Sequence, residues 1–87
     1  MKVEIRQSFV KDALKLQANI QKEIADIIIT IENIRKLSEL PACKKLKGYK
    51  TAYRIKIGDY RISFFFENNT IELVRVLNRK DIYRYFP

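Results

Sequence analysis

Three cationic side chains, Arg54, Lys56 and Arg61, follow a spacing that can build an anion-binding surface. The segments on either side of Gly58-Asp59 alternate apolar and polar residues, which is typical of strands whose successive side chains point to opposite faces. The Gly-Asp pair favours a tight turn, so the hairpin should bring Arg61 beside the other two cations. Like charges on neighbouring strands repel one another. The pattern therefore indicates either a site for an anion or a sheet face whose charges are spread in solvent.

Two further side chains, Arg79 and Tyr83, follow the segment 70–77, which is predicted as a third and more fully buried strand. If that strand is central, its end delivers Arg79 to the same surface, and Tyr83 lies one helical turn later. Tyr83 has a second interpretation, as an aromatic ring that covers the edge of the core. Arg75 lies within the strand among apolar neighbours, and the sequence leaves open whether it joins the basic face or emerges at an edge.

The distribution of charge also points to a polyanion. The 87 residues hold 18 Lys and Arg against 10 Asp and Glu, a formal net charge of +8, and the pI is about 9.8. Residues 1–43 hold seven basic and six acidic residues, whereas residues 44–87 hold eleven and four. A basic half beside a balanced half favours nucleic acid as the partner. A soluble basic protein without such a partner is the alternative.

Several classes of protein are disfavoured by the composition. Cys43 is the only cysteine and there is no histidine, so an internal disulfide is excluded and neither a metal nor another cofactor is expected. No apolar run is long enough to span a bilayer, and the early charges do not resemble a secretory signal. We therefore expect a cytoplasmic protein that forms one domain over residues 1–87.

The first half of the chain is predicted to form a short strand and two helices. Residues 2–7 suit a strand, and Ser8 is the expected N-cap of a first helix. From Asn19 to Glu39 a second helix is predicted, because isoleucines recur there at alternating steps of four and three. These isoleucines are Ile20, Ile24, Ile27, Ile31 and Ile34.

The second half is predicted to form a sheet. Pro41 ends the second helix, and residues 41–50 are expected to be a lysine-rich loop. Three strands joined by two short turns then make an antiparallel meander. Residues 80–86 suit a last helical turn. The order β-α-α-β-β-β predicts an α+β fold in which a helical hairpin packs on an antiparallel sheet.

Two stretches resemble the signature of the RelE/ParE toxin superfamily: Lys47-Gly48 followed by residues 53–62, and the closing segment 76–83 with its Arg-x-x-x-Tyr pattern. The resemblance covers essentially the whole chain. It implies the RelE-like microbial RNase fold and a toxin of a type II toxin–antitoxin pair. RelE-like members cleave mRNA in the ribosomal A site without a metal. A cognate antitoxin neutralises them, and operator DNA is bound only by the toxin–antitoxin complex.

The resemblance also implies roles for individual residues. Lys56 matches a catalytic lysine, Arg61 matches the arginine after the turn, and Arg79 and Tyr83 match the C-terminal arginine and tyrosine. Arg54 falls where another basic residue is used.

The chain departs from the family pattern at two positions. Arg54 stands where some members carry lysine, and Asn78 stands where many carry histidine before the arginine. Because the chain has no histidine, a mechanism with an imidazole base is excluded.

Metal-free RNA cleavage needs a base for the ribose 2′-hydroxyl, charge stabilisation at the phosphorane and a proton for the leaving oxygen. Arg61 and Arg79 suit the second task, because guanidinium groups bind phosphate oxygens and stay charged. Lys56 and Tyr83 are left for proton transfer, and cations around a tyrosine should lower its pKa. Arg54 is the expected phosphate anchor. Contact with ribosomal RNA is expected from the loop lysines Lys44, Lys45, Lys47 and Lys50.

Two other functions fit the same fold, since one fold hosts many activities. ParE-like members inhibit DNA gyrase and generally lack the catalytic set that this chain retains. A module that binds nucleic acid without cutting it is the third possibility.

Overall fold

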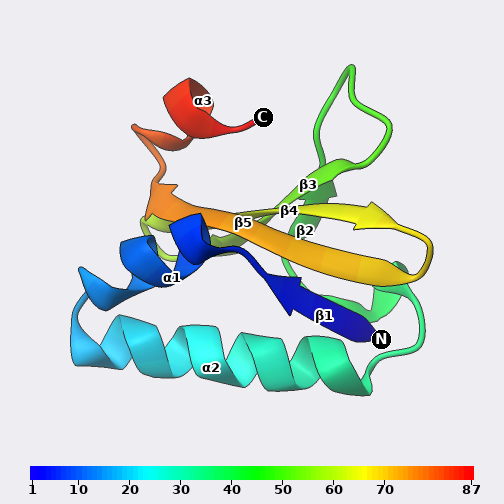
Figure 1. Cartoon of the computed structure of the whole chain (residues 1–87), viewed down its shortest axis with the longest axis horizontal. Coiled ribbons are helices and arrows are strands. Elements are labelled where there is room, and N and C mark those ends of the chain that lie inside the picture. The colour runs from blue at the N-terminus through cyan, green and yellow to red at the C-terminus, as the bar shows by residue number, and fades with distance from the viewer.

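A five-stranded sheet forms the centre of the computed structural model, which describes residues 1–87 (Figure 1). The strands are β1 (Lys2–Ile5), β2 (Cys43–Lys45), β3 (Ala52–Ile57), β4 (Tyr60–Glu67) and β5 (Thr70–Asn78). The helices are α1 (Gln7–Leu14), α2 (Ala18–Asn33) and α3 (Ile82–Tyr85), with a 3-10 turn at Leu37–Glu39. The predicted α+β fold class and the β3-β4-β5 meander are confirmed.

The sheet has the order β1-β5-β4-β3-β2. Strand β1 pairs with β5 in parallel, whereas all other neighbouring strands are antiparallel. The sheet is therefore mixed, whereas the sequence predicts a wholly antiparallel one. Strand β2 lies within residues 41–50, for which the sequence predicts a loop. Its three residues carry no apolar alternation, and the strand exists because its backbone pairs with β3.

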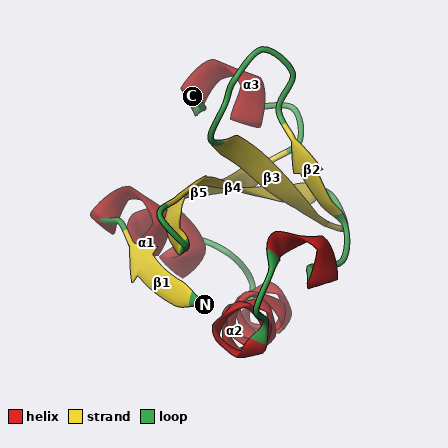
Figure 2. Cartoon of the chain, turned by 90° about the vertical axis from the view of Figure 1, so that its right-hand side faces the viewer, coloured by secondary structure: helices red, strands yellow, loops and turns green.

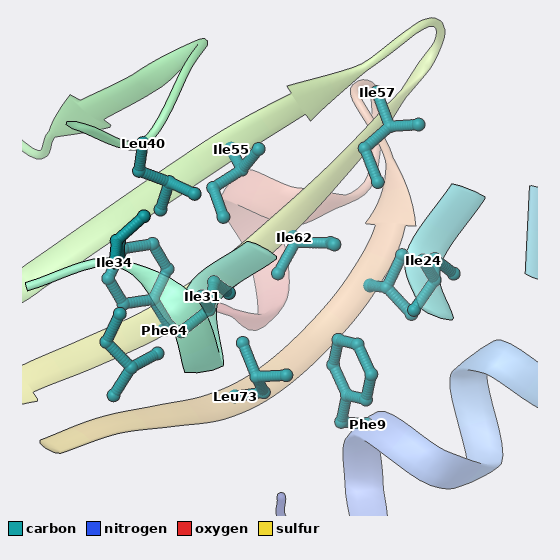
Figure 3. Packing of buried hydrophobic residues seen from close by; sticks show 12 residues of the cluster. Phe9, Ile24, Ile31, Ile34, Leu40, Ile55, Ile57, Ile62, Phe64 and Leu73 are labelled. Atoms are coloured by element: carbon teal, nitrogen blue, oxygen red, sulfur yellow. The ribbon is translucent and has the colours of Figure 1, made fainter. Parts of the chain in front are cut away.

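The main core lies between the sheet and α2, which runs along one face of the sheet while α3 lies on the other (Figures 1 and 2). Ile24 and Ile31 of α2 are buried, as the isoleucine periodicity predicts. They belong to a cluster of twelve buried residues that includes Phe64 and Leu73 from the sheet (Figure 3). This face therefore supplies most of the hydrophobic stabilisation.

Helix α2 ends earlier than the sequence predicts, at Asn33 instead of Glu39. The α-amino group of Met1 donates hydrogen bonds to the carbonyls of Glu32 and Ile34, both at 3.0 Å, and so satisfies two groups at the helix end. The Glu39 carboxylate accepts hydrogen bonds from the backbone N–H groups of Arg35 and Lys36, which lowers its pKa. These contacts depend on distant or non-helical partners, so the periodicity alone does not reveal the break.

The first helix also begins differently from the prediction. Its N-cap position is Arg6, not Ser8, and α1 starts at Gln7. The Ser8 hydroxyl donates a hydrogen bond to the Val74 carbonyl at 2.6 Å, so it ties α1 to β5 instead of capping the helix.

A second, smaller apolar cluster lies on the opposite face of the sheet, under α3. Ile82 and Phe86 are 3% and 5% exposed and pack with Ala52 and Val74. Because these two side chains are four residues apart, they lie on one side of the helical turn and fasten it to the sheet. None of the helices combines the length and the apolar character that a membrane span requires.

Candidate functional site

The strand register brings the predicted cations together on the face that α2 does not cover. Lys56 is opposite Arg61 in the β3–β4 pair, and Lys44 is opposite Arg54 in the β2–β3 pair. These four side chains line a concavity of about 380 Å³ with Ala42 and Cys43. The predicted placement of Arg61 beside Lys56 is therefore confirmed.

Tyr83 reaches this basic surface from α3. Its hydroxyl oxygen accepts a hydrogen bond from Arg54 Nη1 at 2.8 Å, and the Arg54 guanidinium carbon lies 5.3 Å from the centre of its ring. The side chain is 72% exposed, so the ring does not cover the core edge. The phenol is held by an arginine but is open to an incoming ligand.

The charges around Tyr83 lower the pKa of its phenol, as predicted from the sequence. The hydrogen bond from Arg54 is the largest cause, followed by the positive charge of Arg54, with smaller contributions from Arg61 and Lys44. The tyrosinate is therefore formed at a lower pH than in an ordinary tyrosine, so a larger fraction of Tyr83 is in the form that can act as a base.

Arg61 is held at the turn between β3 and β4. Its Nη1 donates hydrogen bonds to the carbonyls of Gly58 and Tyr60, both at 2.9 Å. Gly58 has a φ of +55°, the left-handed conformation that glycine adopts without steric cost. The turn thus fixes one nitrogen of Arg61 and leaves Nε and Nη2 free to bind phosphate oxygens.

Arg79 lies beside the same turn but does not line the concavity. Its backbone N–H donates a hydrogen bond to the Asp59 carbonyl at 2.8 Å, and its side chain is exposed and makes no ion pair. The end of β5 therefore delivers Arg79 to the same end of the sheet as Arg61, although Arg79 is not among the residues that line the concavity.

The loop lysines separate into two groups. Lys44 belongs to the basic concavity, and Lys47 and Lys50 are exposed on the 46–51 loop, which projects on the same side of the sheet as α3 (Figure 2). Lys45 does not join them, because it lies on the other side of β2. There it lines a hollow with Leu37, Ser38, Leu40, Cys43 and Tyr53.

Arg75, whose place the sequence left open, bridges two helices. Its Nε and Nη2 donate hydrogen bonds to the Asp12 carboxylate at 2.7 and 3.0 Å, and its guanidinium carbon lies 5.1 Å from the ring centre of Tyr85. Sequence reasoning missed Asp12. An acidic residue three positions after Phe9, on the apolar side of α1, was the available signal that a buried partner was needed.

Cys43 borders the concavity but has the wrong chemistry for a nucleophile. Burial raises the pKa of its thiol to about 11, so the thiol stays protonated at neutral pH. No three side chains of the Cys, Asp or Glu types come together as a metal site anywhere in residues 1–87.

Comparison with known proteins agrees with the geometry. Residues 3–83 match the family described as the ParE toxin of the type II toxin–antitoxin system, parDE. Toxin RelE3 of Methanocaldococcus jannaschii is 44% identical over 88 residues, which cover 100% of both chains.

Solved structures share the fold. A crystal structure of a RelB–RelE antitoxin–toxin complex from Methanococcus jannaschii matches with a TM-score of 0.82 and 41% identity, covering 97% of this chain and 99% of the other. The isolated Escherichia coli RelE toxin matches with a TM-score of 0.69 and 18% identity over 95% and 90% of the two chains. The second match supports the fold alone. The chain therefore belongs to the RelE/ParE superfamily of type II toxin–antitoxin toxins, and within it to the RelE type.

Proposed function

We propose that this protein is a ribosome-dependent, metal-independent endoribonuclease that cleaves messenger RNA in the ribosomal A site. The observation that carries the proposal is the contact between Arg54 and Tyr83 beside Lys56 and Arg61. It combines a phenol of lowered pKa with several fixed positive charges on an open surface. The identity of 44% to Toxin RelE3 supports the same reading.

The arrangement suits an attack by the ribose 2′-hydroxyl on the neighbouring phosphorus. Tyr83, or Lys56 in its place, takes the proton of the 2′-hydroxyl as the new O–P bond forms. The P–O5′ bond breaks, and a protonated group of the site or water returns a proton to the departing 5′ oxygen. Arg61 and Arg79 stabilise the negative charge of the phosphorane, and Arg54 anchors the phosphate while it orients the phenol.

The partners follow from the same proposal. The 46–51 loop with Lys47 and Lys50, together with Lys44, contacts the ribosomal RNA backbone through charge. A cognate antitoxin neutralises the toxin in the cytoplasm, as the RelB–RelE complexes among the solved structures suggest, and operator DNA is bound only by that complex. Exposed apolar side chains such as Ile5, Leu14 and Ile29 offer surface that such a partner would cover.

The test is primer extension on an mRNA incubated with the purified protein, with and without programmed ribosomes. Cuts within the A-site codon that appear only with ribosomes support the proposal. Cuts on naked RNA would make the protein a free ribonuclease. Absence of cuts in both samples would contradict the proposal, and a gyrase supercoiling assay would then test the ParE-like alternative.

Substitutions separate the roles of the residues in this assay. Tyr83→Phe and Arg61→Ala should each lower the cleavage rate by about a hundredfold to a thousandfold, because each removes proton transfer or charge stabilisation. Tyr53→Phe and Arg35→Ala are the matched controls. Both remove the same chemical groups away from the basic concavity, so both proteins should cut at the normal rate. Full activity of Tyr83→Phe would leave Lys56 as the base.

A further inference from the structure

Helix α3 lies between two contacts of the same kind, each an arginine against a tyrosine. On one side Arg54 lies over the ring of Tyr83 at 5.3 Å, and on the other Arg75 lies over Tyr85 at 5.1 Å. The two arginines belong to β3 and β5, and the register aligns both with Ser63 of the intervening strand β4. The helical turn thus spans three strands with a cationic contact on each flank.

Helix geometry explains why both tyrosines can take part. Ile82 and Phe86 point to the sheet, and at about 100° per residue Tyr83 and Tyr85 project to opposite sides of that buried stripe. A rotation of α3 about its axis would move one phenol toward the sheet and lift the other away. The Tyr85 contact therefore opposes any rotation that would take Tyr83 from Arg54.

The two arginines are held very differently. Arg75 forms a bidentate ion pair with Asp12, whose carboxylate also accepts the backbone N–H of Val76 at 3.1 Å. Asp12 is only 6% exposed, so this pair is fixed by burial on α1. Arg54 makes no ion pair at all. One flank of α3 is consequently rigid, and the other is free to meet phosphate.

A single helical turn needs such a support. Isolated short helices are unstable in water, and the apolar contacts of Ile82 and Phe86 are non-directional, so they fix the depth of α3 better than its rotation. The contact between Arg75 and the ring of Tyr85 restricts the rotation of α3, because Arg75 is itself held by the buried carboxylate of Asp12.

We propose that Asp12, Arg75 and Tyr85 are positioning residues that hold α3 in the rotation at which the Tyr83 phenol meets Arg54. This assignment rests on the proposed function, in which Tyr83 transfers the proton. It gives α1, which contributes nothing else to the basic surface, a part in the cleavage reaction.

Kinetics of Tyr85 variants in the full-length protein test the assignment, since Tyr85 is 55% exposed and its replacement should not prevent folding. Tyr85→Ala should lower kcat for ribosome-dependent cleavage by about tenfold to a hundredfold, the loss expected from a small misplacement of a reacting group, with little change in KM. Tyr85→Phe keeps the ring and should restore the rate. In a Tyr83→Phe background, Tyr85→Ala should cause no further loss, because its effect passes through the missing phenol.

A titration supplies a readout that does not depend on cleavage. NMR of carbon-labelled tyrosine follows the pKa of Tyr83, which Arg54 of β3, Arg61 of β4 and Lys44 of β2 all lower. Tyr85→Ala should raise this pKa, and Tyr85→Phe should not. Arg35→Met is the control, because it removes an exposed arginine beyond the end of α2 that contacts neither α3 tyrosine.

The outcomes of the two experiments are distinct. An unchanged Tyr83 pKa and an unchanged kcat in Tyr85→Ala would overturn the positioning assignment even if the toxin cleaves mRNA. If the unmodified protein does not cleave mRNA, the proposed function fails, and the titration alone then confirms or rejects the positioning of Tyr83.

Discussion

The two faces of the sheet differ in what covers them. On the α2 side, twelve buried apolar residues form one cluster, and they come from the sheet, from α1 and α2, and from the segment that follows α2. The opposite face has a four-residue cluster beneath α3, and beside it an uncovered row of cations with the exposed phenol of Tyr83. One face is therefore apolar and buried, whereas the other is open and carries a concentration of positive charge.

This difference shows how a small chain can tolerate an unfavourable charge pattern. Like charges on adjacent strands, such as Lys56 and Arg61, destabilise a sheet. The large core on the α2 side offsets that cost, so the basic face need not contribute to stability. Substitutions on the two faces should therefore affect different properties.

The largest expected effect is a loss of stability from a substitution in the core on the α2 side. Ile31 is fully buried, and Ile31→Ala should lower the free energy of unfolding by about 2–5 kcal/mol through lost burial and a cavity. Ile29→Ala makes the same change in the same helix at a side chain that is 56% exposed. Urea unfolding should show a much smaller loss there. Equal losses in the two variants would mean that the α2 face is not the main source of stability.

The α2 side is also the part of the fold that the sequence predicts best. The isoleucine spacing reveals which side of the helix is buried, because burial on one face imposes its own period. The end of α2 at Asn33 was missed, because it depends on the amino group of Met1 and on the Glu39 carboxylate. Neither partner leaves a periodic signal in the chain.

The basic face is predictable only in part. Arg54, Lys56 and Arg61 meet because strand alternation and a two-residue turn determine their register, and both are local properties. The Arg54–Tyr83 hydrogen bond joins residues 29 positions apart and depends on how Ile82 and Phe86 seat α3. The Asp12–Arg75 pair likewise spans 63 positions, so no short-range pattern could reveal it.

The pH dependence of the cleavage rate tests the role of Tyr83 on the basic face. If tyrosinate at Tyr83 is the base, the cleavage rate should rise about tenfold per pH unit until the pH reaches the pKa of Tyr83. Because the Arg54 hydrogen bond is the main cause that lowers this pKa, Arg54→Gln should raise it and move the profile to higher pH. Arg79→Gln should lower the rate without moving the profile, since Arg79 is not among the charges that lower this pKa. Identical profiles for the unmodified protein and Arg54→Gln would contradict a tyrosinate base.

The smallest expected effect is on the salt dependence of ribosome binding. It is tested at two residues that are adjacent in sequence but lie on opposite faces of β2. Lys44 lines the basic concavity, whereas Lys45 lies against Leu37, Leu40 and Tyr53 on the other side. If Lys44 contacts one phosphate, Lys44→Ala should reduce the salt dependence of ribosome binding by about one unit of log K per log salt, and Lys45→Ala should leave it unchanged. Binding measured over a range of salt concentrations checks both variants. Equal reductions would show that binding depends on total charge, so the distinction between the two faces would not extend to substrate recognition.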